Sequence, residues 1–115
     1  MSTYQDRISA LNALLPQPNK IQRGVAFLDE NAPNWRGKVD INKIDMGHSQ
    51  RCILGQVFGD FFDSCKRFNL TDEHAEYLGF LARNTRSSTE IAILNYTWRQ
   101  ALRRSLPWYK RLLVF

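Results

Sequence analysis

The chain of 115 residues is long enough for one domain with its own core, and a content of 43% hydrophobic and 23% charged residues excludes wholesale disorder. No stretch approaches the roughly 18 to 20 apolar residues that cross a bilayer. Residues 1–20 also lack the basic start and long apolar run of a secretory signal. We therefore expect a cytoplasmic protein with no membrane partner.

The net charge of +5 is concentrated in the last third of the chain. Residues 83–115 carry seven Arg or Lys and one acid, Glu90, whereas residues 1–82 carry nine basic and ten acidic groups. Such asymmetry favours a polyanionic or acidic partner, and a solvated basic face is the alternative interpretation.

Two amphipathic helices and a connector are predicted in the first half of the chain. Residues 4–15 place apolar side chains at helical spacing (Ile8, Leu11, Leu14 and Leu15), and the following prolines end this helix. A second stripe from Ile21 to Leu28 predicts another helix, after which Trp35 is expected to fold back against the core. Residues 36–50 alternate imperfectly between apolar and polar types, so we expect an ordered connector made of a short extended piece or a turn of helix.

The sequence CILGQVFGDFFDSC at residues 52–65 predicts a central helix. Gly55 and Gly59 flank its apolar face, which suggests that another backbone passes close to both. Cys52 and Cys65 on one helix would lie about 20 Å apart, too far for a disulfide, so two reduced thiols are expected. The apolar stripe has the spacing of one continuous helix and consists of Leu54, Phe58, Phe61, Cys65 and Phe68.

Two further helices are expected after the central one. Thr71 caps a helix over residues 72–82, where acidic residues in the first turn suit the helix dipole. Ser87, three residues before Glu90, forms the pattern of a capping box and opens a helix that ends before Pro107.

The expected fold class is therefore all-α. Residues 1–106 form a single compact domain of about five helices, with the irregular connector at residues 36–50. Residues 107–115 form a basic and apolar tail. This tail either packs back on its own domain, mediates self-association into a homo-oligomer, or contacts a partner.

Residues near the start of the central helix are the best candidates for metal binding or catalysis. Cys52 follows His48 by four residues, and Asp45 precedes His48 by three, so the three side chains could face one metal ion on a helix. A zinc site needs a fourth ligand that no spacing supplies, and a helix start capped by Asp45 or Ser49 explains the same residues. A thiol nucleophile would have only His48 as its base. We expect no metal, no cofactor and no catalytic residue, and therefore a protein that is not an enzyme.

Basic residues interleaved with aromatics make the strongest functional pattern. Arginine contacts phosphates, and aromatic rings stack on bases or anchor protein interfaces. A protein partner is favoured because no nucleic-acid motif is recognisable, and DNA or RNA binding by the arginine face is the alternative. The candidate partner-binding residues are Arg99, Arg103, Arg104, Trp108, Tyr109, Lys110 and Arg111.

Three motifs in residues 24–102 resemble a family of small uncharacterised proteins from bacteriophages and prophages, notably those of actinobacterial phages. The first motif is LDE followed by Pro and Trp, the second is D-x-x-x-I-D, and the third is C-x-L-G-Q-x-F-G-D. They fall here on Leu28, Asp29, Glu30, Pro33 and Trp35; on Asp40, Ile44 and Asp45; and on Cys52, Leu54, Gly55, Gln56, Phe58, Gly59 and Asp60.

The resemblance implies a phage accessory protein that acts in the host cytoplasm and binds a host or phage macromolecule, in the alternative case as a nucleic-acid-binding regulator or anti-defence factor. It supplies no catalytic residues. It makes Gln56 and Asp60 candidates for a binding surface, since both belong to the signature and to the polar side of the central helix. Equally, Gln56 could hydrogen bond to the connector.

Overall fold

The computed structural model describes residues 18–105 of the chain, and this part is all-α. It holds five α-helices and two short 3-10 helices, with no strand among the described residues, which confirms the predicted fold class. The predicted helix at residues 4–15 and the tail at residues 107–115 lie outside this range. The elements are α2 (Pro18–Asn31), η1 (Trp35–Lys38), η2 (Ile41–Lys43), α3 (Ile53–Phe58), α4 (Phe61–Arg67), α5 (Asp72–Tyr77) and α6 (Ser88–Ser105).

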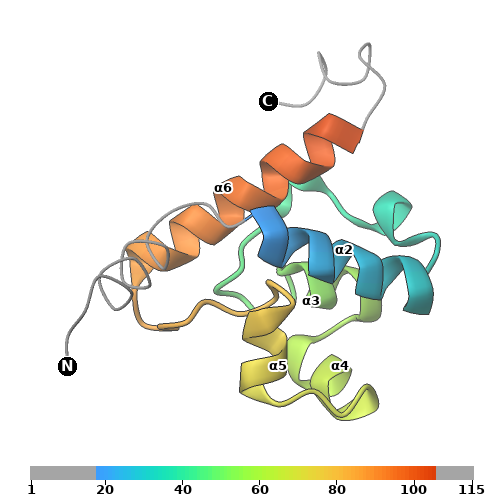
Figure 1. Ribbon diagram of the computed structural model, residues 1–115, viewed down its shortest axis with the longest axis horizontal. Coiled ribbons are helices and arrows are strands. Elements are labelled where there is room, and N and C mark those ends of the chain that lie inside the picture. The colour runs from blue at the N-terminus through green and yellow to red at the C-terminus, as the bar shows by residue number, and fades with distance from the viewer. Residues whose placement is uncertain (1–17, 106–115) are drawn as a thin grey trace.

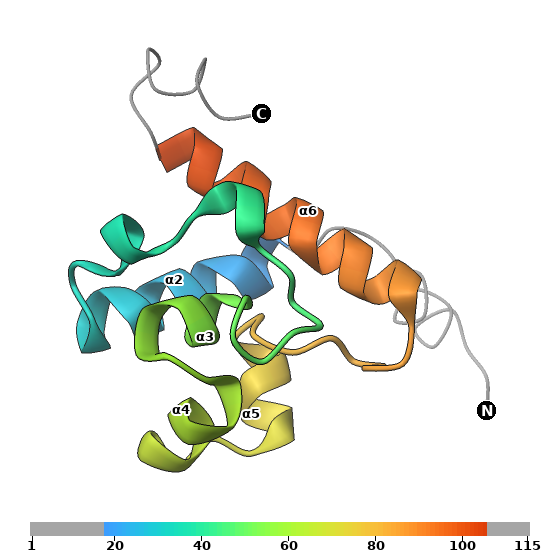
Figure 2. The ribbon, with the colours of Figure 1, turned by 180° about the vertical axis from the view of Figure 1, so that it is seen from behind.

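The long helix α6 forms one side of the domain, and α2 packs against it (Figure 1). Viewed from behind, the connector that contains η2 lies against α6, and α3 lies in front of α2 (Figure 2). The short helices α4 and α5 are placed below α3, away from α6. The arrangement leaves α6 in contact with both α2 and the connector.

Two tryptophans form the centre of the core. Trp98 of α6 is fully buried and stacks on Phe80 with 5.8 Å between ring centroids, while Trp35 meets Trp98 edge-on at 6.4 Å. Each indole N–H has a partner, as buried indoles require: Trp98 Nε1 donates to Gly79 O, and Trp35 Nε1 donates to Asp29 Oδ1. The prediction that Trp35 folds back against the core is confirmed.

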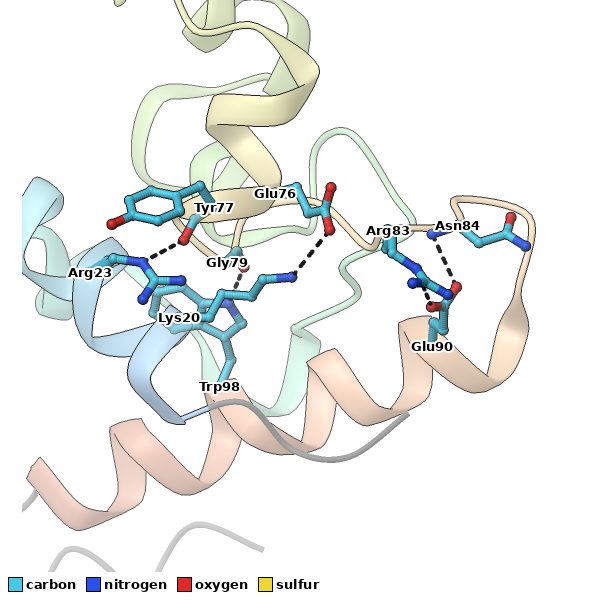
Figure 3. A network of polar contacts seen from close by, with 9 residues as sticks. All are labelled: Lys20, Arg23, Glu76, Tyr77, Gly79, Arg83, Asn84, Glu90 and Trp98. Atoms are coloured by element: carbon cyan, nitrogen blue, oxygen red, sulfur yellow. Dashed lines mark hydrogen bonds and ion pairs between the residues drawn. The ribbon is translucent and has the colours of Figure 1, made fainter. Parts of the chain in front are cut away.

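Polar contacts join α6 to the α5–α6 loop and α2 to α5 (Figure 3). Lys20 Nζ lies 3.9 Å from Glu76 Oε1, and Arg23 Nε donates to Tyr77 O at 2.9 Å. At the start of α6, Ser87 Oγ accepts from the backbone N–H of Glu90, which is half of the predicted capping box. The Glu90 carboxylate does not complete the box, because it accepts from Asn84 N at 3.0 Å and pairs with Arg83.

The prediction of a single central helix across residues 52–68 is wrong, because the helix is interrupted between α3 and α4. Gly59 ends α3 with φ of 105°, a backbone conformation that favours glycine. Asp60 then caps α4, its carboxylate accepting from Phe62 N and Asp63 N. The apolar spacing continues across the break because both helices bury their apolar sides in the same core.

The two glycines of this segment have different roles. A Cβ on Gly55 would collide with the backbone of Ser49 and Gln50, so the predicted close approach of another backbone is confirmed there. The same prediction is wrong for Gly59, where a Cβ would meet no atom within 4 Å. Glycine is needed there because the backbone has a positive φ. The 20 Å separation expected for the two cysteines does not apply, because they lie on different elements, and both are free thiols.

The connector at residues 36–50 is neither a strand nor a continuous helix but a chain of turns that contains η1 and η2. Its backbone groups are satisfied by side chains that reach in from the helices. Gln56 of α3 and Asn95 and Arg99 of α6 all hydrogen bond to it. The connector is therefore ordered, as predicted, through contacts made by the helices on either side of it.

Candidate functional site

The candidate arginines of α6 have different environments. Arg99 is half-buried, with Nε donating to Ile41 O at 3.3 Å and Nη2 to Ile44 O at 2.8 Å. Arg103 is also half-buried and its Nε is enclosed without a hydrogen bond, whereas Arg104 is exposed. They therefore do not form one solvated arginine face. Trp108, Tyr109, Lys110 and Arg111 lie outside the described residues.

A groove of about 600 Å³ runs between α2 and α6. Its apolar lining is Ile21 and Val25 from α2, Trp35 from η1, and Ala101 and Leu102 from α6. The polar lining is Gln22, Arg36, Tyr96, Thr97, Gln100 and Arg104. We call this feature the α2–α6 groove.

The rim of the α2–α6 groove combines an aromatic ring with two arginines. Tyr96 is 55% exposed, which is high for so large a side chain. Arg36 covers the Trp35 ring at 4.6 Å and pairs with Asp29 at 2.7 Å, so its charge is partly neutralised. Arg104 lies on the same side of α6, two turns after Tyr96. Tyrosine, tryptophan and arginine are the residues that carry most binding energy at protein interfaces.

Sequence reasoning found Arg104 but missed the apolar part of the groove. The stripe of α2 identified Ile21 and Val25 as apolar, yet a helical period does not show which neighbour covers a side chain. The groove joins residues about 75 positions apart in the sequence, so only the packing of α2 on α6 brings them together.

His48 and Cys52 line a different cavity, of about 440 Å³, with Phe61, Leu81 and Ile91. Burial raises the pKa of the Cys52 thiol to about 11, so the thiol stays protonated at neutral pH. Its Sγ accepts from Gly55 N at 3.3 Å, and His48 Nδ1 accepts from Gln50 N at 3.1 Å. The Cys52 sulfur and the His48 ring therefore both accept hydrogen bonds from nearby backbone N–H groups.

The prediction that Asp45 or Ser49 caps the central helix is wrong, because α3 begins later than expected. Cys52 itself is the N-cap of α3, while Asp45 Oδ1 accepts from Gly47 N within the connector. Residues 18–105 contain no group of three or more His, Cys, Asp or Glu placed to hold a metal ion.

The signature residues Gln56 and Asp60 bond to the protein's own backbone. Gln56 Oε1 accepts from Asp40 N at 2.7 Å, and Gln56 Nε2 donates to Arg51 O at 2.9 Å. The alternative role of Gln56, hydrogen bonding to the connector, is therefore observed. Asp60 caps α4. Their surface role stays a prediction, and the α2–α6 groove is the stronger candidate.

Comparisons of the chain with protein-family models, with curated proteins and with solved structures each found no match. Within the described part of the chain, no helix has both the length and the apolar character needed to cross a membrane.

Proposed function

We propose that the protein is a non-enzymatic binding protein that engages another protein through the α2–α6 groove together with the C-terminal region that follows α6. The observation that carries the proposal is the groove itself. It has an apolar floor and a Tyr96 and arginine rim, and it lies beside the end of α6 that leads into residues 107–115.

The groove suits a peptide segment with a few apolar side chains flanked by acidic ones. Apolar anchors would contact Val25 and Ala101, and carboxylates would meet the guanidinium of Arg104 at the rim. Interfaces of this kind place aromatic and arginine contacts around a water-excluding apolar centre. The resemblance to phage proteins supports a host or phage protein as the partner and the host cytoplasm as the place of action.

The thiol chemistry at Cys52 supports a non-enzymatic role. A cysteine nucleophile works as the thiolate, which needs a lowered pKa, whereas burial shifts the Cys52 pKa the other way. Its sulfur is also used to cap α3. The cavity beside it therefore lacks an activated nucleophile.

The proposal is tested by capture from a host lysate with a matched pair of variants. Ala101→Glu places a charge in the groove, and Ala92→Glu makes the same change on the exposed side of α6. We expect wild type and Ala92→Glu to enrich the same partner protein and Ala101→Glu to lose it, with circular dichroism showing that both variants fold. Equal enrichment by all three proteins would contradict the groove. Loss of the captured material on nuclease treatment would favour nucleic acid instead.

A further inference from the structure

A polar pocket lies between the connector and α6, two segments that lie side by side in Figure 2. It has a volume of about 590 Å³. The connector and the turn before α3 supply part of its wall, and α6 supplies the rest. Its lining is Asn42, Lys43, Ile44, Asp45, Arg51, Asn95 and Arg99.

The charges around this pocket are unbalanced. Lys43, Arg51 and Arg99 bring three positive charges, against the single carboxylate of Asp45. None of these three cations forms an ion pair with a carboxylate of the described residues. The Asp45 carboxylate already accepts a hydrogen bond within the connector, from Gly47 N to its Oδ1 at 2.9 Å. The pocket therefore has a net attraction for an anion.

Two of its hydrogen-bond donors are held in place before any ligand arrives. Asn95 Oδ1 accepts from Met46 N at 2.6 Å, which fixes the amide and leaves Nδ2 with two hydrogens to donate. Arg99 is fixed by the carbonyls of Ile41 and Ile44, which take up Nε and Nη2, so Nη1 keeps its donors. Donors fixed in advance cost less entropy on binding than mobile ones.

The other two cations are exposed and complete the set. The side chains of Lys43 and Arg51 have no hydrogen bond or ion pair within the described residues, so both are able to close on a ligand. Guanidinium groups match the oxygens of phosphate in two-point contacts, and an ammonium adds a compact charge.

We propose that this pocket binds a phosphate group through Arg51, Lys43, Arg99 and the amide of Asn95. The group arrives either as a small phosphate monoester or as a phosphodiester of a nucleic-acid backbone, because the same donors suit both. The site lies away from the α2–α6 groove and does not rest on the proposed protein partner.

Titration followed by nuclear magnetic resonance tests the proposal, with inorganic phosphate, adenosine monophosphate and a single-stranded oligonucleotide without terminal phosphates as probes. Sodium chloride at equal ionic strength is the control. We expect saturable shifts in the Asn95 side-chain amide and in the backbone of residues 42–45 with at least one phosphate probe. A stronger response to the monophosphate identifies a small ester as the source, and a stronger response to the oligonucleotide identifies the backbone.

Arg51→Gln is the deciding variant because the exposed Arg51 side chain makes no hydrogen bond or ion pair within the described residues. It should weaken binding by about tenfold or more, since a charged hydrogen bond is lost. Arg86→Gln, which removes another exposed arginine outside the pocket, should leave affinity unchanged. Asp45→Asn keeps the acceptor for Gly47 N and removes the repelling charge, so it should tighten binding. Shifts that match those in sodium chloride, or equal affinity in Arg51→Gln, would overturn the proposal.

Discussion

Three long polar side chains satisfy the backbone of the connector at residues 36–50. Gln56 hydrogen bonds to the backbone of Asp40 and Arg51, while Asn95 and Arg99 of α6 hydrogen bond to the backbone of the connector. A segment without regular structure must find partners for its N–H and C=O groups, and here the helices on either side provide them. The polar residues of α3 and α6 that face the connector therefore have a structural role.

Gln56→Ala should destabilise the protein by about 0.5–1.5 kcal/mol, because the N–H of Asp40 exchanges its side-chain acceptor for water. Urea denaturation measures the loss. Gln22→Ala removes a glutamine from an exposed helical position without a hydrogen bond in the described structure, and should change stability little. Equal stability of the two variants would show that the Gln56 contacts contribute nothing.

The Cys52 thiol should make stability depend on pH in the alkaline range. Its pKa is raised from 9.0 to about 11 in the folded state, so the unfolded chain releases the proton first as pH rises. The contribution is complete below pH 9, and it falls by about 2 kcal/mol as pH passes from 9 to 11. Cys52→Ser should lose less stability than wild type over this range, since the other titrating groups are common to both. Parallel pH profiles would contradict the assignment.

At the scale of elements, apolar spacing predicted which side chains are buried better than where helices end. The stripe through Leu54 and Phe61 was identified correctly, and both are buried. The break between α3 and α4 was missed because both helices face the same core. The sequence did contain a signal for this break, in the pair Gly59–Asp60. Glycine commonly ends helices, and aspartate commonly caps the start of the next one.

The candidate site was predictable only in part, for a similar reason. Charge and composition identified Arg99 and Arg104 as candidates on α6. They could not show that Arg99 is held by the connector carbonyls while Arg104 borders a groove. That distinction depends on how α2 and the connector pack on α6, which spans distances in sequence that local patterns do not cover.

Gly59→Ala should destabilise the protein by about 1–3 kcal/mol, because φ of 105° is strained for a residue with a Cβ. Gly37→Ala is the matched control. A Cβ at either position meets nothing within 4 Å, but Gly37 does not have a positive φ. The difference in urea midpoints therefore isolates the backbone conformation. A neutral Gly59→Ala would mean that the turn between α3 and α4 is made in another way.

At the scale of the whole molecule, α6 separates two surfaces. Tyr96, Gln100 and Arg104 face the α2–α6 groove, whereas Asn95 and Arg99 face the polar pocket. At 100° per residue the two sets are centred about 120° apart around the helix, so they lie on neighbouring faces. A peptide in the groove and a phosphate in the pocket would not compete for the same space.

The two surfaces should therefore act independently. Ala101→Glu is expected to leave phosphate affinity unchanged, and Arg51→Gln is expected to leave partner capture unchanged, because neither residue lines the other site. Titration and capture with each variant check this. A loss of both activities in either variant, without unfolding, would show that the sites are coupled.

The most direct test of the central claim, a protein interface at the α2–α6 groove, is a binding titration of the purified partner at about 50 and 200 mM salt. An interface with an apolar centre predicts an affinity that changes little with salt and that falls by about tenfold or more in Ala101→Glu but not in Ala92→Glu. An affinity that drops by about a thousandfold or more over that range would indicate phosphate-driven binding. Such a drop, together with equal affinity for the two variants, would contradict the account.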